Sequence, residues 1–330
     1  MVKRSTRRVM KVVLKKCWYL TEEWADNKNM QLTYVDLHVH STCSDGYYSP
    51  EELVTLAKTA GLAAISLADH DNIDGIERAS AAGAEAGIEV IPAVELSTQW
   101  FQYSDMHLLG YGFDFQDPYL VRALADFQEF RRTRNLQIIA KVNQKLSVEK
   151  RQPIAPEAVQ KLAGGTIGRP HIAQALRQAG HVTSNEDAFQ RYLVPCNVPK
   201  RYFPVDEAIN LLHSSGGIAV LAHPPYITRD RKQLEMLVTE LVALGLDGLE
   251  AYNNGSGLED TDWLIKLARE HDLIVTGGSD FHGDPGSAIE VGRGVRGLRV
   301  PYDSVTEIKS ALQKRQAIMG VNDIRLKTTI

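Results

Sequence analysis

Two short strings concentrate the residues of this chain that could do chemistry. Residues 35–46 read Val-Asp-Leu-His-Val-His-Ser-Thr-Cys-Ser-Asp-Gly, and residues 277–282 read Gly-Gly-Ser-Asp-Phe-His. In each string an apolar run ends in His and Asp. Side chains on a strand repeat every two residues, so His38 and His40 share one face. Imidazole and carboxylate groups are typical metal ligands, and burying them is costly unless an ion binds them.

The elements that must position these residues alternate along the chain. We expect strands at 34–39, 63–68, 89–94, 107–112, 218–222, 248–252 and 273–277. Helical patterns lie between several of them, at 50–60, 73–87, 231–244 and 260–271. Alternating strands and helices predict an α/β fold with a mostly parallel sheet, and seven units indicate a closed or nearly closed β/α barrel.

Side chains at the carboxyl ends of barrel strands converge on one mouth, so possible ligands should gather there. The residues that follow this rule are His38, His40, Asp45, His70, Glu95, His223, Asp280 and His282, with His107 as an exception at the start of its predicted strand. Six imidazoles and three carboxylates are too many for one ion and suit two or three. Any single His among them could instead be an ordinary hydrogen-bonded residue.

The stretch from about 117 to 215 breaks the rhythm of the barrel. It contains a long helical pattern at 120–146 and then several Pro and Gly residues, with no convincing strand. We interpret 117–215 as a helical insertion, or cap, between two barrel segments at 34–116 and 216–330. Gly164, Gly165 and Gly168 weakly suggest a loop that cradles phosphate. The cations that could bind phosphate are Arg169, His171, Arg132, Arg134, Lys200 and Arg201.

Composition sets the remaining limits. The chain has 330 residues, of which 44% are hydrophobic and 24% charged, as in an ordinary globular protein. Its three Cys form no CxxC pair, which argues against a disulfide framework and a thiolate zinc site and favours a reducing, cytoplasmic setting. No apolar run reaches the ~20 residues of a membrane span, so we expect no membrane association.

The N-terminal extension, residues 1–33, is unusually basic. Residues 1–30 hold eight Lys or Arg against three Asp or Glu, a net charge of +5, although the whole chain has a formal charge of −4. Such a segment could be an arm that binds nucleic acid or a membrane, or a presequence. It could equally be a loosely ordered extension that precedes a natural start at Met30.

As an ensemble, five motifs resemble those of the polymerase and histidinol phosphatase (PHP) family. They are DLHVHSTCSDG, LADHD, PAVELS, LAHP and GGSDFH, in that order within 34–115 and 216–283. The resemblance implies a distorted (β/α)7 barrel with a site for two or three divalent ions, Mn²⁺, Zn²⁺ or Fe²⁺. It implies three ligand groups: His38, His40, Glu95 and Asp280; Asp45, His70 and His282; and Glu95, His107 and His223. It also implies that His38, His40, Asp45, Glu95 and Asp280 are catalytic.

Within that family, the insertion and the string Gly168–Ala173 resemble one branch. This branch consists of phosphatases acting on nucleoside 3′,5′-bisphosphates, including enzymes that trim RNA from the 5′ end. We therefore expect a metal-dependent phosphoesterase whose partner is a nucleotide or a short RNA, with no obligatory protein partner. Two alternatives stay open: a phosphatase for histidinol phosphate or another small molecule, and a regulatory protein that binds nucleic acid through its basic N-terminus.

Overall fold

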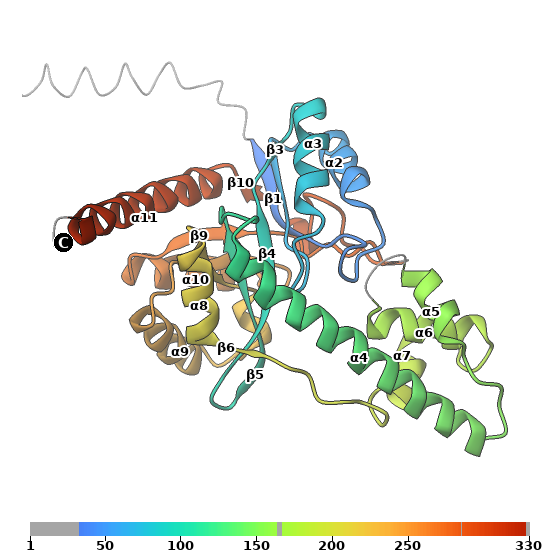
Figure 1. The fold of residues 1–330 in the computed structure, drawn as a ribbon. Helices are drawn as coiled ribbons and strands as arrows, with labels where there is room; N and C mark the ends of the chain where they lie inside the picture. The colour runs from blue at the N-terminus through green and yellow to red at the C-terminus, as the bar shows by residue number, and fades with distance from the viewer. Residues whose placement is uncertain (1–32, 164–166, 285, 328–330) are drawn as a thin grey trace, which may run out of the picture. The chain divides into compact units, whose positions relative to one another are not determined.

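The computed structural model describes residues 33–163, 167–284 and 286–327, and these form an α/β fold with two mixed β-sheets (Figure 1). Ten strands belong to the described part: β1 (Tyr34–Val39), β2 (Ala64–Leu67), β3 (Glu89–Val90), β4 (Ala93–Trp100), β5 (Tyr103–Tyr111), β6 (Phe203–Pro204), β7 (Ile218–Leu221), β8 (Gly248–Tyr252), β9 (Ile274–Gly277) and β10 (Val300–Pro301). One sheet has the order β10-β1-β2-β3, and the other has the order β6-β4-β5-β7-β8-β9.

The prediction of a mostly parallel sheet is wrong in the centre of the second sheet. Strand β5 runs antiparallel to both of its neighbours, β4 and β7. The predicted strand at 89–94 is in fact two strands separated by Ile91 and Pro92, and the second continues to Trp100 before turning back. A two-residue hairpin turn can only join antiparallel strands, because a parallel pair needs a long crossover.

The two sheets meet through their inner faces and at two isolated bridges. Apolar side chains from both sheets, such as Leu37 and Val220, share one buried hydrophobic cluster. The parallel bridge between His70 and Glu95 links the end of β2 to β4, and a bridge between Val39 and Phe281 links β1 to the segment after β9. Among the described strands the hydrogen-bonded ladders form two separate sheets rather than one closed barrel.

Helices connect most of the strands and cover the sheets (Figure 1). The α-helices are α2 (Pro50–Thr59), α3 (Ile76–Ala86), α4 (Pro118–Val148), α5 (Pro156–Ala163), α6 (Arg169–Gln178), α7 (Asn185–Ala188), α8 (Val205–Ser214), α9 (Arg231–Ala243), α10 (Leu258–Glu270) and α11 (Asp303–Lys327). Shorter helical turns are η1 (Phe189–Leu193), η2 (Pro224–Tyr226) and η3 (Val295–Gly297). The sequence predicted neither α11 nor β10.

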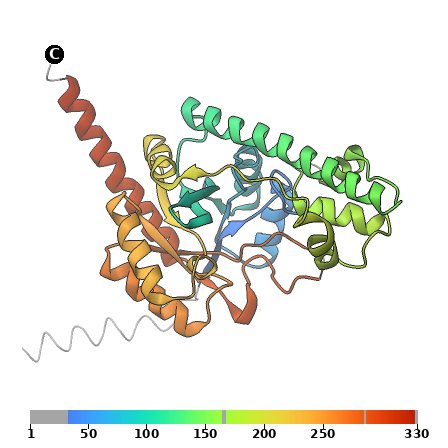
Figure 2. The same ribbon diagram turned by 90° about the horizontal axis from the view of Figure 1, so that it is seen from below.

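Helix α4 joins two hydrophobic cores. Near its start, Leu120 and Leu124 pack into the core formed by β4, β5 and α8–α10. Near its end, Val142 and Leu146 belong to a second core made entirely of residues between 138 and 196. Figure 2 shows α4 reaching from the sheets to the short helices α5 and α6. The predicted insertion therefore contains a core of its own, although β6 also lies within 117–215.

Some predictions fall on residues that the structure does not describe. Residues 1–32, with the basic N-terminal segment, and Gly164 and Gly165 lie outside the described part. Within the part that is described, every helix is too short or too polar to cross a membrane.

Candidate metal centre and its cationic cavity

The carboxyl end of β1 brings two imidazoles together, as their spacing predicts. Nε2 of His38 lies 3.1 Å from Nε2 of His40. Oε2 of Glu95, from β4, lies 3.3 Å from each of these nitrogens. Oδ1 of Asp280, from the loop after β9, lies 3.1 Å from Nε2 of His40 and 3.5 Å from Nε2 of His38. These four ligand atoms all lie within 4.8 Å of one another, close enough to surround one cation.

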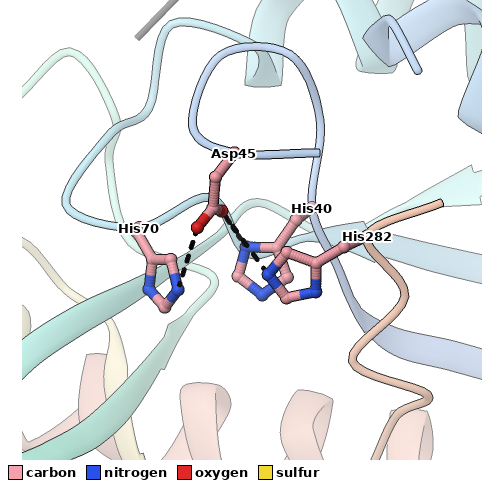
Figure 3. Close-up of side chains that lie close together, drawn as sticks. All are labelled: His40, Asp45, His70 and His282. Atoms are coloured by element: carbon pink, nitrogen blue, oxygen red, sulfur yellow. Dashed lines mark ion pairs between the residues drawn. The ribbon is translucent and has the colours of Figure 1, made fainter. Parts of the chain in front are cut away.

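A second group surrounds Asp45, which lies in the loop after β1 (Figure 3). Its Oδ1 lies 3.4 Å from Nε2 of His282, and its Oδ2 lies 3.9 Å from Nε2 of His70. The rings of His40 and His282 stack with their centroids 4.1 Å apart. Because His40 offers Nε2 to the first group and Nδ1 to the second, one imidazole can serve both groups.

The third group is centred on Glu95. Its Oε1 lies 2.8 Å from Nδ1 of His107 and 2.9 Å from Nε2 of His223, and its Oε2 lies 2.9 Å from Nδ1 of His70. His107 reaches this place because β5 is antiparallel, so its first half lies beside the second half of β4, where Ser97 pairs with His107. The apparent exception in the sequence thus has a topological cause.

Backbone geometry at the site is unusual at two of these residues. His223 has φ of 27° and Asp280 has φ of 52°, conformations that are costly for residues other than glycine. The backbone N–H of His223 donates to Oε2 of Glu250, and that of Asp280 donates to the carbonyl of His38, at 2.7 and 2.8 Å. At Gly278, a Cβ atom would lie 2.2 Å from Cβ of His38, so only glycine permits this close approach.

The buried polar atoms of the cluster fit divalent cations. Among the described residues, several of these atoms make no hydrogen bond of normal geometry, although some lie close to another ligand atom: His40 Nδ1, Asp45 Oδ1, His70 Nδ1, Glu95 Oε2, His223 Nδ1 and both ring nitrogens of His107. Buried polar groups are nearly always hydrogen-bonded, so this concentration of exceptions needs a ligand. Imidazole with carboxylate is a donor set suited to zinc, manganese or iron.

The charges within the cluster agree with this fit. Burial raises the pKa of the Glu95 carboxyl, but the facing imidazoles, led by His107 and His70, lower it more, so this pKa lies well below its usual range. At Asp280 burial acts in the same way, and the surrounding imidazoles, led by His38, together outweigh it and lower the pKa. Burial lowers the pKa of His107, but the carboxylates of Glu95 and Asp105 together outweigh this and raise the pKa to about 10. The carboxylates are therefore ionised, and a divalent cation would displace imidazole protons.

Sequence reasoning missed the carboxylate that orients His38. Oε1 of Glu250, in the buried strand β8, lies 2.9 Å from Nδ1 of His38, which leaves Nε2 of that ring facing the first ligand group. Such partners fix the tautomer and orientation of a metal-binding imidazole. The only signal was a lone acidic residue inside the apolar run Gly248–Tyr252.

A cationic cavity adjoins the cluster. It encloses about 220 Å³, and its lining includes Asp45, His70 and His107 together with five cations: Arg131, Arg134, Arg169, Lys200 and Arg201. Arg131 donates from Nη1 to the carbonyl of His70 at 2.8 Å, and so connects α4 to the cluster. Lys200 pairs with Asp105. Burial and the neighbouring Arg169 lower the pKa of Arg134 to about 10, so it stays charged at neutral pH.

Two of the proposed substrate-binding residues lie elsewhere. Arg132 is 61% exposed, pairs with Glu129 on its own helix and does not line the cavity. Arg131, one residue earlier, occupies the face of α4 that does. His171 is buried, and its Nδ1 accepts a hydrogen bond from the backbone N–H of Gly168, which places it in the N-terminal cap of α6.

A buried cluster of imidazoles and carboxylates at the strand ends of an α/β fold defines a class, the metal-dependent hydrolases. Comparison with known proteins gives the family. The profile described as PHP domain matches residues 36–194. A 5′-3′ exoribonuclease of Haemophilus influenzae is 37% identical over 261 residues, covering 78% of this chain and 93% of that protein. The chain therefore belongs to the PHP family.

Other relatives have related names. The 5′-3′ exoribonuclease Rnm of Escherichia coli is 35% identical over 78% of this chain and 88% of its own length. A 3′,5′-nucleoside bisphosphate phosphatase of Chromobacterium violaceum is 30% identical over 78% of this chain and 90% of its own. A Bifidobacterium adolescentis structure named as a metal-dependent phosphoesterase has 29% identity and a TM-score of 0.71, covering 84% of this chain and 95% of that one. This protein is a metal-dependent phosphoesterase.

Proposed function

We propose that the protein hydrolyses a phosphate monoester of nucleoside 3′,5′-bisphosphates and that the same site trims short RNA from the 5′ end. The observation that carries this proposal is that one cavity borders both the metal-ligand cluster and a group of cations. We call these cations the cationic wall; they are Arg131, Arg134, Arg169, Lys200 and Arg201. His70 and His107 line that cavity together with Arg169 and Lys200. Such a site can hold two phosphates at once, one beside the metal ligands and one against the cations.

The metal-ligand residues hold two or three divalent ions, with Mn²⁺, Zn²⁺ and Fe²⁺ as the proposed identities. The three groups in the structure are His38, His40, Glu95 and Asp280; His40, Asp45, His70 and His282; and His70, Glu95 and His107, with His223 beside Glu95. Divalent ions held there would activate water and polarise the phosphoryl oxygens. The nine residues themselves fix where the scissile phosphate lies, and Glu250 orients His38.

The cationic wall binds the phosphate that is not hydrolysed. Among the described residues, no acidic side chain pairs with Arg169 or Arg201, which instead lie over the rings of Phe189 and Phe127. Arg169 is the first residue of α6, where free backbone N–H groups also favour an anion. A dianion would relieve the mutual repulsion of the five cations. We therefore assign Arg169, Arg134 and Lys200 to substrate binding as part of this proposal.

Phosphate release from a small panel of substrates tests the proposal. We expect adenosine 3′,5′-bisphosphate to be turned over faster than adenosine 5′-monophosphate or histidinol phosphate, and a chelator to stop the reaction. Arg169→Ala should raise KM for the bisphosphate about tenfold or more, because a charge-assisted hydrogen bond is lost. The exposed Arg132→Ala is the matched control and should leave KM unchanged.

Other outcomes would favour the alternatives. Faster turnover of phosphates without a base would indicate a small-molecule phosphatase. RNA binding without any turnover, lost on deletion of residues 1–29, would indicate the regulatory protein.

Three broader proposals accompany this function. The two sheets together form a distorted (β/α)7 barrel, supported by the bridges at His70 and at Val39. The barrel segments are 34–116 and 216–330, with 117–215 as the cap, supported by the separate core between 138 and 196. A cytoplasmic location and the absence of an obligatory protein partner remain predictions from the sequence.

A further inference from the structure

The hairpin between β4 and β5 presents a large aromatic side chain to solvent. Trp100 pairs with Tyr103, so Phe101 and Gln102 form a two-residue turn. Phe101 is 80% exposed. Among the described residues its ring contact is an edge-to-face one with Trp100, at a centroid distance of 4.5 Å. Packing within the folded protein therefore does not explain a phenylalanine at this position.

The backbone at this position also disfavours phenylalanine. Phe101 has φ of 46° and is the first central residue of the turn. Glycine is the residue that such two-residue turns prefer when this position has a positive φ. A phenylalanine therefore makes the turn less stable than glycine would, without the compensation of burial. Backbone strain of this kind at an exposed site is a reason to look for a function.

The position of the hairpin beside a cavity at the metal-ligand cluster indicates what that function is. A second cavity, of about 430 Å³, also borders the cluster, and none of the five cations of the cationic wall is among its lining residues. Its lining includes His107 and Asp280 from the cluster, Gln102 and Tyr103 from the hairpin, and Tyr226 from η2. Phe101 directly precedes Gln102 along the chain, so the turn that carries it belongs to the hairpin that borders this cavity, where Tyr103 and Tyr226 supply two further aromatic side chains.

We propose that this second cavity receives the 3′ side of a single-stranded RNA and that Phe101 is a stacking platform for one of its bases. The inference rests on the proposed function, in which the 5′ phosphate binds the cationic wall and the scissile phosphate lies at the cluster. The second cavity borders the same cluster, so the rest of the strand can leave through it, past Tyr226 and the hairpin. Aromatic rings stack on any unpaired base, which suits trimming without sequence preference.

Single-stranded RNA fits this surface better than a protein segment. The lining combines the aromatic rings of Tyr103 and Tyr226 with groups that can hydrogen-bond base edges, such as Gln102 and Ser104. A nucleoside bisphosphate has no nucleotide beyond the phosphate that lies at the cluster, so it has no base to place on the hairpin. The hairpin should therefore matter for oligonucleotides and not for the mononucleotide.

The experiment compares two substrates on the metal-loaded enzyme, a 5′-phosphorylated hexaribonucleotide and adenosine 3′,5′-bisphosphate. Phe101→Gly should lower kcat/KM for the hexanucleotide about tenfold, because base stacking is lost, and leave kcat/KM for the bisphosphate unchanged. Phe101→Trp should retain hexanucleotide activity. Tyr119→Ala, which removes another exposed aromatic ring that lines neither cavity, is the control.

Phe101→Gly has a second advantage, because it should preserve or raise thermal stability by removing the strained conformation. A loss of hexanucleotide activity in this variant therefore cannot be a folding defect. Equal kcat/KM of Phe101→Gly and wild type on the hexanucleotide, or an equal fall on both substrates, would overturn the inference while the proposed function stood. If wild type neither released phosphate from the bisphosphate nor released mononucleotides from the hexanucleotide, the proposed function itself would fail.

Discussion

The metal-ligand cluster and the cationic wall border the same cavity but are built in different ways. The cluster comes from strand ends and the loops after them, and its members are buried or half-buried against one another. The wall comes from α4, from the start of α6 and from the segment before β6, and its cations include Arg169 and Arg201 without acidic partners in the described part. Strand ends fix a few atoms rigidly for chemistry, whereas helices and loops offer charges that select the substrate.

The sharpest test of this division is Glu95→Gln, since Glu95 belongs to two ligand groups and contacts five imidazoles. We expect phosphoesterase activity to fall about 10³-fold or more, because the metal contribution to the barrier is worth several kcal/mol. Metal content, measured by elemental analysis, should fall with it. The exposed Glu259→Gln is the control. If Glu95→Gln kept its full metal content and more than a tenth of wild-type activity, the proposed role of Glu95 as a metal ligand would be contradicted.

Arg131→Ala should have a smaller and different effect. Arg131 lines the cationic cavity and hydrogen-bonds the carbonyl of His70, but it is no metal ligand. We expect kcat/KM for the bisphosphate to fall about tenfold, through loss of a charge-assisted hydrogen bond, with metal content unchanged. Kinetics and metal analysis on the same samples check this. Arg132→Ala serves as the neighbouring control. If Arg131→Ala also lost bound metal, the cationic wall and the metal-ligand cluster would not be functionally separate.

Asp247 offers a reference outside both regions. It accepts hydrogen bonds from the backbone N–H of Ala219, from His213 and from Arg315, at 2.8, 2.8 and 2.7 Å. Burial raises the pKa of Asp247, but these partners, led by His213, lower it below its usual value. A lowered carboxyl pKa contributes stability above the unfolded value, near pH 4, and this is lost as pH falls through the folded value.

Asp247→Asn should therefore destabilise the protein by about 1–3 kcal/mol at pH 7 and by less at low pH. Urea unfolding at pH 7 and at about pH 3 measures both values, and kcat/KM for the bisphosphate should stay as in wild type. An unchanged difference in unfolding free energy at the two pH values would show that the charge of Asp247 is unimportant.

The sequence was most informative where strand periodicity and chemistry coincide. His38 and His40 share a face because strands repeat every two residues, and the structure brings them within hydrogen-bonding distance. The topology around His107 could not be predicted, because nothing in the apolar run at 107–112 distinguishes a parallel from an antiparallel strand. The role of Glu250 could not be predicted for a related reason. A carboxylate in a buried strand can be explained only when its partner is known, and here the partner is His38, 212 residues away.

The cationic wall was harder to predict, because the angular position of each residue around α4 decides whether its side chain lines the cavity. Arg131 and Arg132 are adjacent in sequence, yet a rotation of about 100° per residue puts only the first in the cavity. The hairpin was missed because the strand at 89–94 was read as ending where β4 continues to Trp100. Periodicity identifies that an element exists far better than it fixes where the element ends.

Helix α4 has one more consequence. It is a single helix of 31 residues, anchored in one core by Leu120 and Leu124 and in the other by Val142 and Leu146, with Arg131 and Arg134 between the anchors. Because both ends of this unbroken helix are packed into hydrophobic cores, its middle cannot easily move. The distance between its guanidinium groups and the strand ends is therefore fixed, and in the proposed function this distance limits binding to substrates whose two phosphates have a matching separation.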